Sequence, residues 1–154
     1  MKLFFKLCAG LLLAFALTGC FGEDYDVGVP TAHLDLDLTS VQLTEANVSW
    51  KTASEDVQQK IEDVEEFAAS LDEIIVFSGQ KSYLNFKENE NNGGDIWTDQ
   101  KITAALLQDD KRIELDLDDS REFQFPKTRG HYILEVVFTN SAGSAQYVGN
   151  VVIK

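Results

Sequence analysis

The sequence predicts a mainly β domain, an antiparallel β-sandwich with one inserted amphipathic helix. Apolar and polar residues alternate in several short runs, for example from Leu34 to Leu38 and from Ile113 to Asp118. This period of two is typical of half-buried strands. Segments rich in Asn, Asp and Gly separate the runs and supply the turns. Residues 55–71 are the exception, because their apolar residues follow the helical period.

The first 20 residues have the layout of an export signal. Lys2 and Lys6 precede an uncharged apolar run from Leu7 to Leu17, which is shorter than the about 20 residues needed to span a bilayer. The run ends in Leu17-Thr18-Gly19-Cys20, which resembles the lipobox of bacterial lipoproteins. The resemblance implies that residues 1–19 are a signal peptide, removed before Cys20. It also implies that Cys20 carries diacylglycerol and an N-acyl lipid and anchors the chain on the extracytoplasmic face of the cell membrane.

Residues 20–30 are expected to form the lipidated tether, which spans at most about 35 Å when extended. Removal of residues 1–19 takes away two Lys and no acid, so the formal charge changes from −13 to −15. This acidic surplus argues against nucleic acid and anionic headgroups as partners. We therefore expect membrane contact through the lipid alone. Because Cys8 leaves with the signal peptide and Cys20 holds the lipid, disulfides and Cys-based zinc sites are excluded from the domain.

The domain is expected to occupy residues 31–154. Its first alternating run places Leu34, Leu36 and Leu38 on one buried face. Shorter strands are expected through Val41 to Leu43 and through Val48 to Trp50, with Trp50 in the core.

Residues 55–71 are predicted to form one helix with Ser54 as its N-cap. The spacing of their apolar residues is that of a single helical stripe, made of Val57, Ile61, Val64, Ala68 and Leu71. Two interpretations remain open: the stripe packs on the sheet, which we favour, or it binds a partner.

Beyond the helix, residues 74–77 are apolar on both faces and predict a central strand. A further strand is expected over 82–87. Residues 102–107 and 112–117 are predicted to pair as a hairpin across 108–111. Trp97 follows Gly93-Gly94 and is either a core residue or an exposed aromatic for binding.

The last third of the chain carries a second resemblance. Phe123-Gln124-Phe125-Pro126 is followed by Gly130-x-Tyr132-x-Leu134-x-Val136 and by Asn140-x-x-Gly143, a predicted hairpin turn that leads into the closing strand from Tyr147 to Ile153. This arrangement resembles the final strands of bacterial immunoglobulin-like domains of the PKD and fibronectin-III kind. The resemblance implies an immunoglobulin-like sandwich and places Tyr132 at the tyrosine corner, a structural position. The helix predicted at 55–71 departs from that family pattern.

Catalytic signatures are missing from the sequence. His33 and His131 are expected to be solvent-facing strand residues outside any triad or metal pattern, and there is neither a nucleophile elbow nor a phosphate loop. Acidic strand faces, Asp35/Asp37 and Glu114/Asp116/Asp118, would form one negative patch if their strands were neighbours. A solvated outer face is the alternative that we favour.

Calcium binding is the more specific alternative to a general binding role. The loop at 88–99 loosely resembles an EF-hand, whose oxygen ligands alternate around a Gly turn. Its weak candidate ligands are Glu88, Glu90, Asn92 and Asp99. The competing interpretation is a polar hairpin loop. The sequence thus predicts a non-enzymatic lipoprotein that binds a protein or cell-wall component, with divalent-cation binding as the alternative.

Overall fold

The computed structural model describes residues 28–53, 55–88 and 95–154. Within these ranges the chain forms a series of β-strands and one short helix. In chain order the elements are β1 (Thr31–Leu36), β2 (Thr39–Gln42), β3 (Thr44–Lys51), β4 (Asp56–Gln59), α2 (Val64–Ala69), β5 (Glu73–Val76), β6 (Lys81–Lys87), β7 (Lys101–Gln108), β8 (Lys111–Leu115), β9 (Glu122–Gln124), β10 (Gly130–Asn140) and β11 (Gly143–Ile153).

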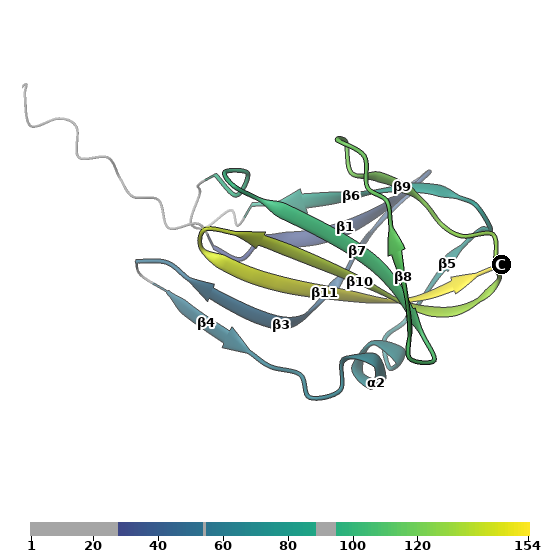
Figure 1. The fold of residues 1–154 in the computed structure, drawn as a ribbon, viewed down its shortest axis with the longest axis horizontal. Helices are drawn as coiled ribbons and strands as arrows, with labels where there is room; N and C mark the ends of the chain where they lie inside the picture. Colours follow the sequence, from purple (N-terminus) through teal and green to yellow (C-terminus); the bar gives the residue numbers. More distant parts are fainter. Residues whose placement is uncertain (1–27, 54, 89–94) are drawn as a thin grey trace, which may run out of the picture.

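The strands build two sheets (Figure 1). The four-stranded sheet has the order β2-β1-β6-β9, and the seven-stranded sheet has the order β4-β3-β11-β10-β7-β8. β5 lies off this path and pairs in parallel with the second half of β11, whereas the other pairs are antiparallel. The predicted β-sandwich with one helix is therefore confirmed.

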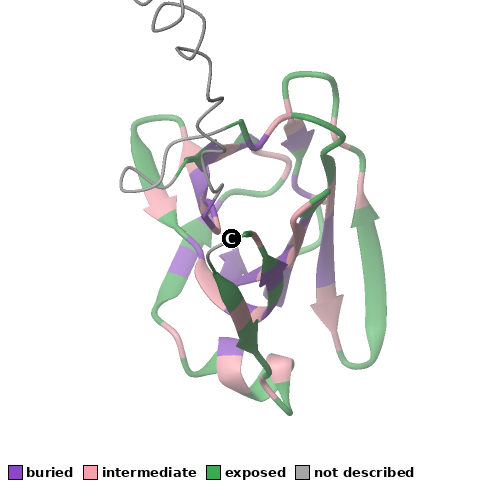
Figure 2. Cartoon of the chain, turned by 90° about the vertical axis from the view of Figure 1, so that its left-hand side faces the viewer, coloured by how far each residue is buried: buried purple, intermediate pink, exposed green. Residues whose placement is uncertain are grey.

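The main core is aromatic and lies between the two sheets. The ring of Phe138 packs against Trp50, with centroids 6.3 Å apart, and against Phe86, at 5.0 Å. The ring of Tyr147 also packs against Phe86, with centroids 6.1 Å apart. Trp50 is completely buried, which confirms its predicted place in the core. Figure 2 shows that the buried residues are concentrated on the strands, while the turns are mostly exposed.

The single helix predicted over 55–71 is wrong in its first half. Residues 56–59 form β4, which pairs with β3 in a register that sets Val57 opposite Trp50. Gln59 also donates from Nε2 to the carbonyl of Ala46 at 2.7 Å. β3 thus offers backbone partners that the helical spacing of the side chains does not reveal. α2 begins only after Asp63, whose Oδ1 accepts from the amide of Glu66 at 2.8 Å; the predicted cap, Ser54, lies outside the described residues.

The apolar side of α2 packs on the outer face of the seven-stranded sheet. Ala68 is completely buried in a second cluster with Ala46, Ile133 and Val148. Four predicted stripe residues contribute to this cluster, namely Ile61, Val64, Ala68 and Leu71, whereas Val57 packs against the main core. A six-residue helix is too short to be stable alone, so this packing holds it in place. The stripe therefore packs on the domain, as we favoured.

Two other apolar runs differ from the prediction. β1 ends at Leu36, so Leu38 lies in the turn that follows, where it is 97% exposed. β5 is an edge strand rather than a central one, because its only partner in the described part of the chain is β11. The buried side chains of β5, Ile74 and Val76, alternate with Ile75 on the exposed face, and Phe77 follows the strand and is exposed too.

Both predicted C-terminal hairpins form. β7 and β8 join through Asp109 and Asp110, which both adopt positive φ, at 48° and 62°, as a two-residue hairpin turn requires. β10 and β11 pair from Gly130 to Ile153. At their turn a Cβ on Gly143 would lie 2.0 Å from the carbonyl oxygen of Ser49, so only glycine fits against β3.

Candidate functional site

The chain enters the domain at one end of the sandwich. Val29 packs against the main core, and the hydroxyl of Tyr147 donates to the carbonyl of Pro30. Burial raises the pKa of Tyr147 above its ordinary value, so the phenol stays protonated and remains a donor. β1 starts at the next residue. We call it the entry end.

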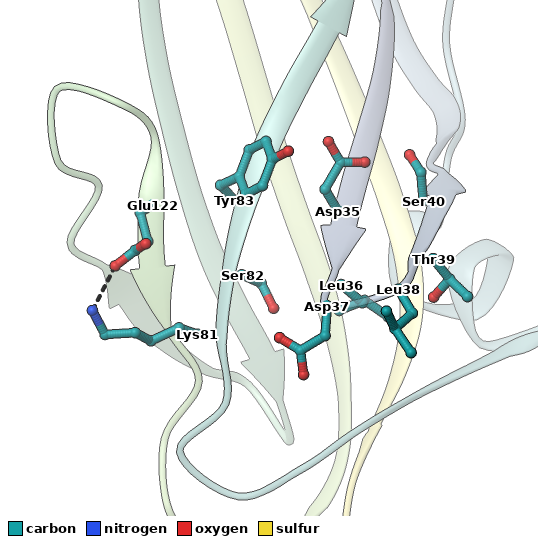
Figure 3. Close-up of a pocket in the computed structure, with 10 residues that line it drawn as sticks. All are labelled: Asp35, Leu36, Asp37, Leu38, Thr39, Ser40, Lys81, Ser82, Tyr83 and Glu122. Carbon is teal, nitrogen blue, oxygen red and sulfur yellow. Dashed lines mark hydrogen bonds and ion pairs between the residues drawn. The ribbon is translucent and has the colours of Figure 1, made fainter.

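A hollow of about 520 Å³ lies at the opposite end of the four-stranded sheet (Figure 3). β1 runs away from the entry end, so the turn between β1 and β2 is distal, and antiparallel pairing brings the first residues of β6 beside it. The strand register aligns one row of side chains across the sheet. In this row Glu122 of β9 pairs with Tyr83 of β6, Tyr83 with Asp35 of β1, and Asp35 with Ser40 of β2.

The charges of the hollow are unevenly compensated. Lys81 Nζ lies 2.7 Å from Glu122 Oε1, and this hydrogen bond raises the pKa of Lys81. By contrast, neither Asp35 nor Asp37 forms an ion pair in the described part of the chain. Asp37 has only a long contact of 3.5 Å with the amide of Gln80. The hollow therefore contains two carboxylates, of Asp35 and Asp37, that no cationic side chain of the described residues pairs with.

Exposed apolar side chains lie at the same end of the domain as these carboxylates, and Leu38 and Tyr83 line the hollow itself. Four large hydrophobic residues are exposed at this end. Their exposed fractions are 97% for Leu38, 66% for Phe77, 47% for Tyr83 and 40% for Ile75. Gln80 links two of the turns, because it approaches Asp37 and accepts at Oε1 from the amide of Phe77 at 2.9 Å. Apolar area beside free carboxylates suits the binding of a partner that carries both apolar and cationic groups.

One buried polar group lies beneath the hollow. Ser82 is on the inward face of β6, and its Oγ makes no hydrogen bond within the described residues. Such a group costs stability. Sequence reasoning missed both this serine and the exposed Leu38, because the alternation of apolar and polar residues continues through Leu38.

The two histidines lie in different sheets. His33 of β1 is only 9% exposed, contrary to the prediction, because its strand lies between β2 and β6. Its Nε2 is 3.1 Å from Thr31 Oγ1, and burial, aided by Lys87, lowers its pKa. The side chain of His131 is 73% exposed, as predicted, and approaches Glu73 at 3.9 Å.

The acidic patch that neighbouring strands would have formed is absent, because the condition for it is not met. Asp35 lies in the four-stranded sheet and Glu114 on β8, an edge of the other sheet, so their strands are not neighbours. Glu114 pairs with Arg112. Asp118 caps a turn, where its Oδ1 accepts from the hydroxyl of Ser120 and from the amides of Glu122 and Ser120. These bonds lower the pKa of Asp118, the one from the Ser120 hydroxyl most.

The calcium hypothesis falls largely on residues that the structure does not describe. Glu90 and Asn92 lie outside the described ranges, which include Glu88 and Asp99. Asp95 is committed to the turn, because its oxygens accept from the amide of Trp97 and from the hydroxyl of Thr98. In the described part of the chain no three acidic, His or Cys side chains are grouped to hold a metal ion. Calcium binding stays a prediction.

Trp97 is half-buried. Its ring meets Phe86 and Phe138 edge-on, with centroids 6.4 and 6.3 Å away, and the guanidinium of Arg121 lies 4.8 Å above it. This packing favours the core interpretation of Trp97.

Tyr132 opens the inward face of β10 and is nearly fully buried. Its hydroxyl donates to the carbonyl of Thr128, four residues upstream, at 3.3 Å. This is the kind of contact that a tyrosine corner makes.

Comparisons with protein-family models, curated proteins and solved structures gave no match to this chain. The described residues contain no helix that is long and apolar enough to cross a membrane. Cys20 and the lipobox lie outside the described ranges.

Proposed function

We propose that the mature chain is a lipid-anchored protein on the extracytoplasmic face of the cell membrane. In this proposal it is a non-enzymatic module that binds a protein or a cell-wall component. The lipobox at Leu17–Cys20 motivates the anchor. The residues between Cys20 and the first strand, which begins at Thr31, would form a short tether. A thioether diacylglycerol has two acyl chains, and each buried CH₂ contributes about 0.8 kcal/mol, which is enough for stable retention.

One observation carries the binding role: most of the large exposed hydrophobics of the described residues lie at the end of the domain farthest from the tether. Leu38, Phe77 and Tyr83 lie where β1 ends and β6 begins, whereas the chain enters beside Tyr147 at the other end. On a tethered domain this distal end would face away from the membrane. Exposed apolar groups that adjoin one another commonly mark interaction surfaces.

The anchor is tested by labelling with a radioactive fatty acid and by membrane fractionation, with wild type compared with Cys20→Ala. We expect label and membrane retention for the wild type only, and an unprocessed or released Cys20→Ala protein. Processing and retention of Cys20→Ala like the wild type would overturn the anchor.

The binding role is tested by cross-linking capture from envelope extract with the soluble 21–154 domain. The variant Leu38→Ser/Phe77→Ser removes distal apolar groups, and Ile113→Ser removes an exposed apolar group from β8, where it serves as the control. We expect the distal variant to lose the captured partner and the control to keep it. Equal capture by all three proteins would contradict the distal surface.

A further inference from the structure

β2 is an unprotected sheet edge. It pairs with β1 on one side, and no strand in the described part of the chain pairs with its other side. In an antiparallel pair, alternate residues of an edge strand direct their N–H and C=O groups away from the sheet. Proteins usually guard such edges with charges, proline or bulges. The sequence of β2, Thr-Ser-Val-Gln, has neither charge nor proline, whereas β4, β5, β8 and β9 each contain a charged residue.

A groove lined by both apolar and polar residues runs beside this edge. It has a volume of about 410 Å³ and opens between β2 and β5, the facing edges of the two sheets. Leu36 and Val41 line it from one sheet, and Ile74 and Val148 from the other. A strand added to β2 would direct every second side chain into this groove, because successive side chains of a strand point to opposite faces.

The charged groups around the edge are acidic. Asp35 and Asp37 flank β2 on the side of the hollow, and Asp72 and Glu73 line the groove on the other side. Apart from the contact of Glu73 with the exposed His131, none of these four carboxylates has an ion-pair partner in the described residues. The nearby Lys81 is engaged by Glu122.

We infer that β2 is the docking edge for an extended, Lys- or Arg-bearing peptide segment of a partner protein. The segment adds as a fifth strand to the four-stranded sheet, with apolar side chains in the groove and cationic ones toward Asp35 and Asp37. A second copy of this chain suits the edge poorly, because edge-to-edge pairing would bring two sets of these carboxylates together in a protein of net charge −13. The inference rests on the proposed binding role and names its surface and partner chemistry.

The test uses two eight-residue synthetic peptides, alternating Lys-Val and alternating Glu-Val, added to the ¹⁵N-labelled soluble 21–154 domain. Amide shifts locate binding and give Kd. We expect the Lys-Val peptide to shift the amides of β2 and of the turn before it, and to bind more weakly as salt is raised. The Glu-Val peptide should leave these amides unchanged.

A pair of variants separates the edge from overall charge. Ser40→Lys/Gln42→Lys places two cations on exposed positions of β2 and should weaken Lys-Val binding at least about tenfold. Ser49→Lys/Gln58→Lys makes the same two substitutions on exposed, paired positions of β3 and β4 and should bind like the wild type. Amide spectra of both variants verify the fold.

Four results would overturn the inference: Lys-Val shifts away from β2 and the turn before it, equal loss in both variants, equal binding of Glu-Val, or β2 shifts that follow protein concentration without peptide, which would indicate self-association. If envelope capture succeeds while β2 does not respond to peptide, the docking edge is wrong and the proposed function stands. If capture and lipid labelling fail, the proposed function falls whatever the peptide result.

Discussion

Ala68→Asp would test whether α2 is held by its packing. Ala68 is completely buried against Ala46, Ile133 and Val148, so the new carboxylate would meet an apolar surface. An unpaired charge in such a position costs several kcal/mol, against a total stability of about 5–15 kcal/mol for a domain. A loss of about 3 kcal/mol lowers the melting midpoint of a domain of this size by about 10 °C.

The neighbouring residue provides the matched control. Ala69 belongs to the same helix but is exposed, so Ala69→Asp adds the same charge without burying it. Near the C-terminal end of a helix this charge costs only about 0.3–1 kcal/mol.

Urea unfolding of the soluble 21–154 domain measures both variants at pH 7 and again near pH 4. Burial raises the pKa of a carboxyl, so the folded Ala68→Asp variant takes up its proton before the unfolded chain does. Its stability deficit relative to the wild type should therefore shrink as the pH falls. If Ala68→Asp loses no more stability than Ala69→Asp at pH 7, α2 does not pack on the sheet.

Three further predictions concern single side chains. Tyr132→Phe removes the hydrogen bond to Thr128 and should cost about 1 kcal/mol, measured as a lower thermal midpoint; an unchanged midpoint would count against a tyrosine corner. Ser82→Ala removes a buried hydroxyl without a hydrogen bond and should raise the unfolding free energy by about 1 kcal/mol, whereas a loss of stability would reveal an unseen partner. Burial lowers the pKa of His33, so as the pH falls below 6.5 the unfolded chain binds a proton at this residue before the folded protein does. His33 therefore lowers the free energy of unfolding as the pH decreases, until the pH reaches the pKa of His33 in the folded state. His33→Gln should flatten that part of the urea midpoint–pH curve, and an unchanged slope would contradict the assignment.

The candidate site was visible in the sequence only in part. Asp35 and Asp37 stood out as acidic members of an alternating run, and Tyr132 as the opening residue of the β10 run. Leu38 matched the same period as Leu34 and Leu36 but lies in a turn. Its position depends on where β1 stops, which pairing with β2 and not the local pattern decides.

The sequence alone determined the fold class, the lipobox resemblance and both C-terminal hairpins, because period, charge and turn chemistry are local properties of the chain. Only the tertiary structure decided which strands are edges. Residues 56–59 form a strand because their backbone groups pair with those of β3. β5 is an edge strand because it pairs only with β11 within the described residues. The open edge of β2 and the row that joins Glu122, Tyr83, Asp35 and Ser40 likewise follow from long-range register. Side-chain period specifies which face of a strand is buried but not its neighbour, because the backbone groups that pair strands are the same in every residue except proline.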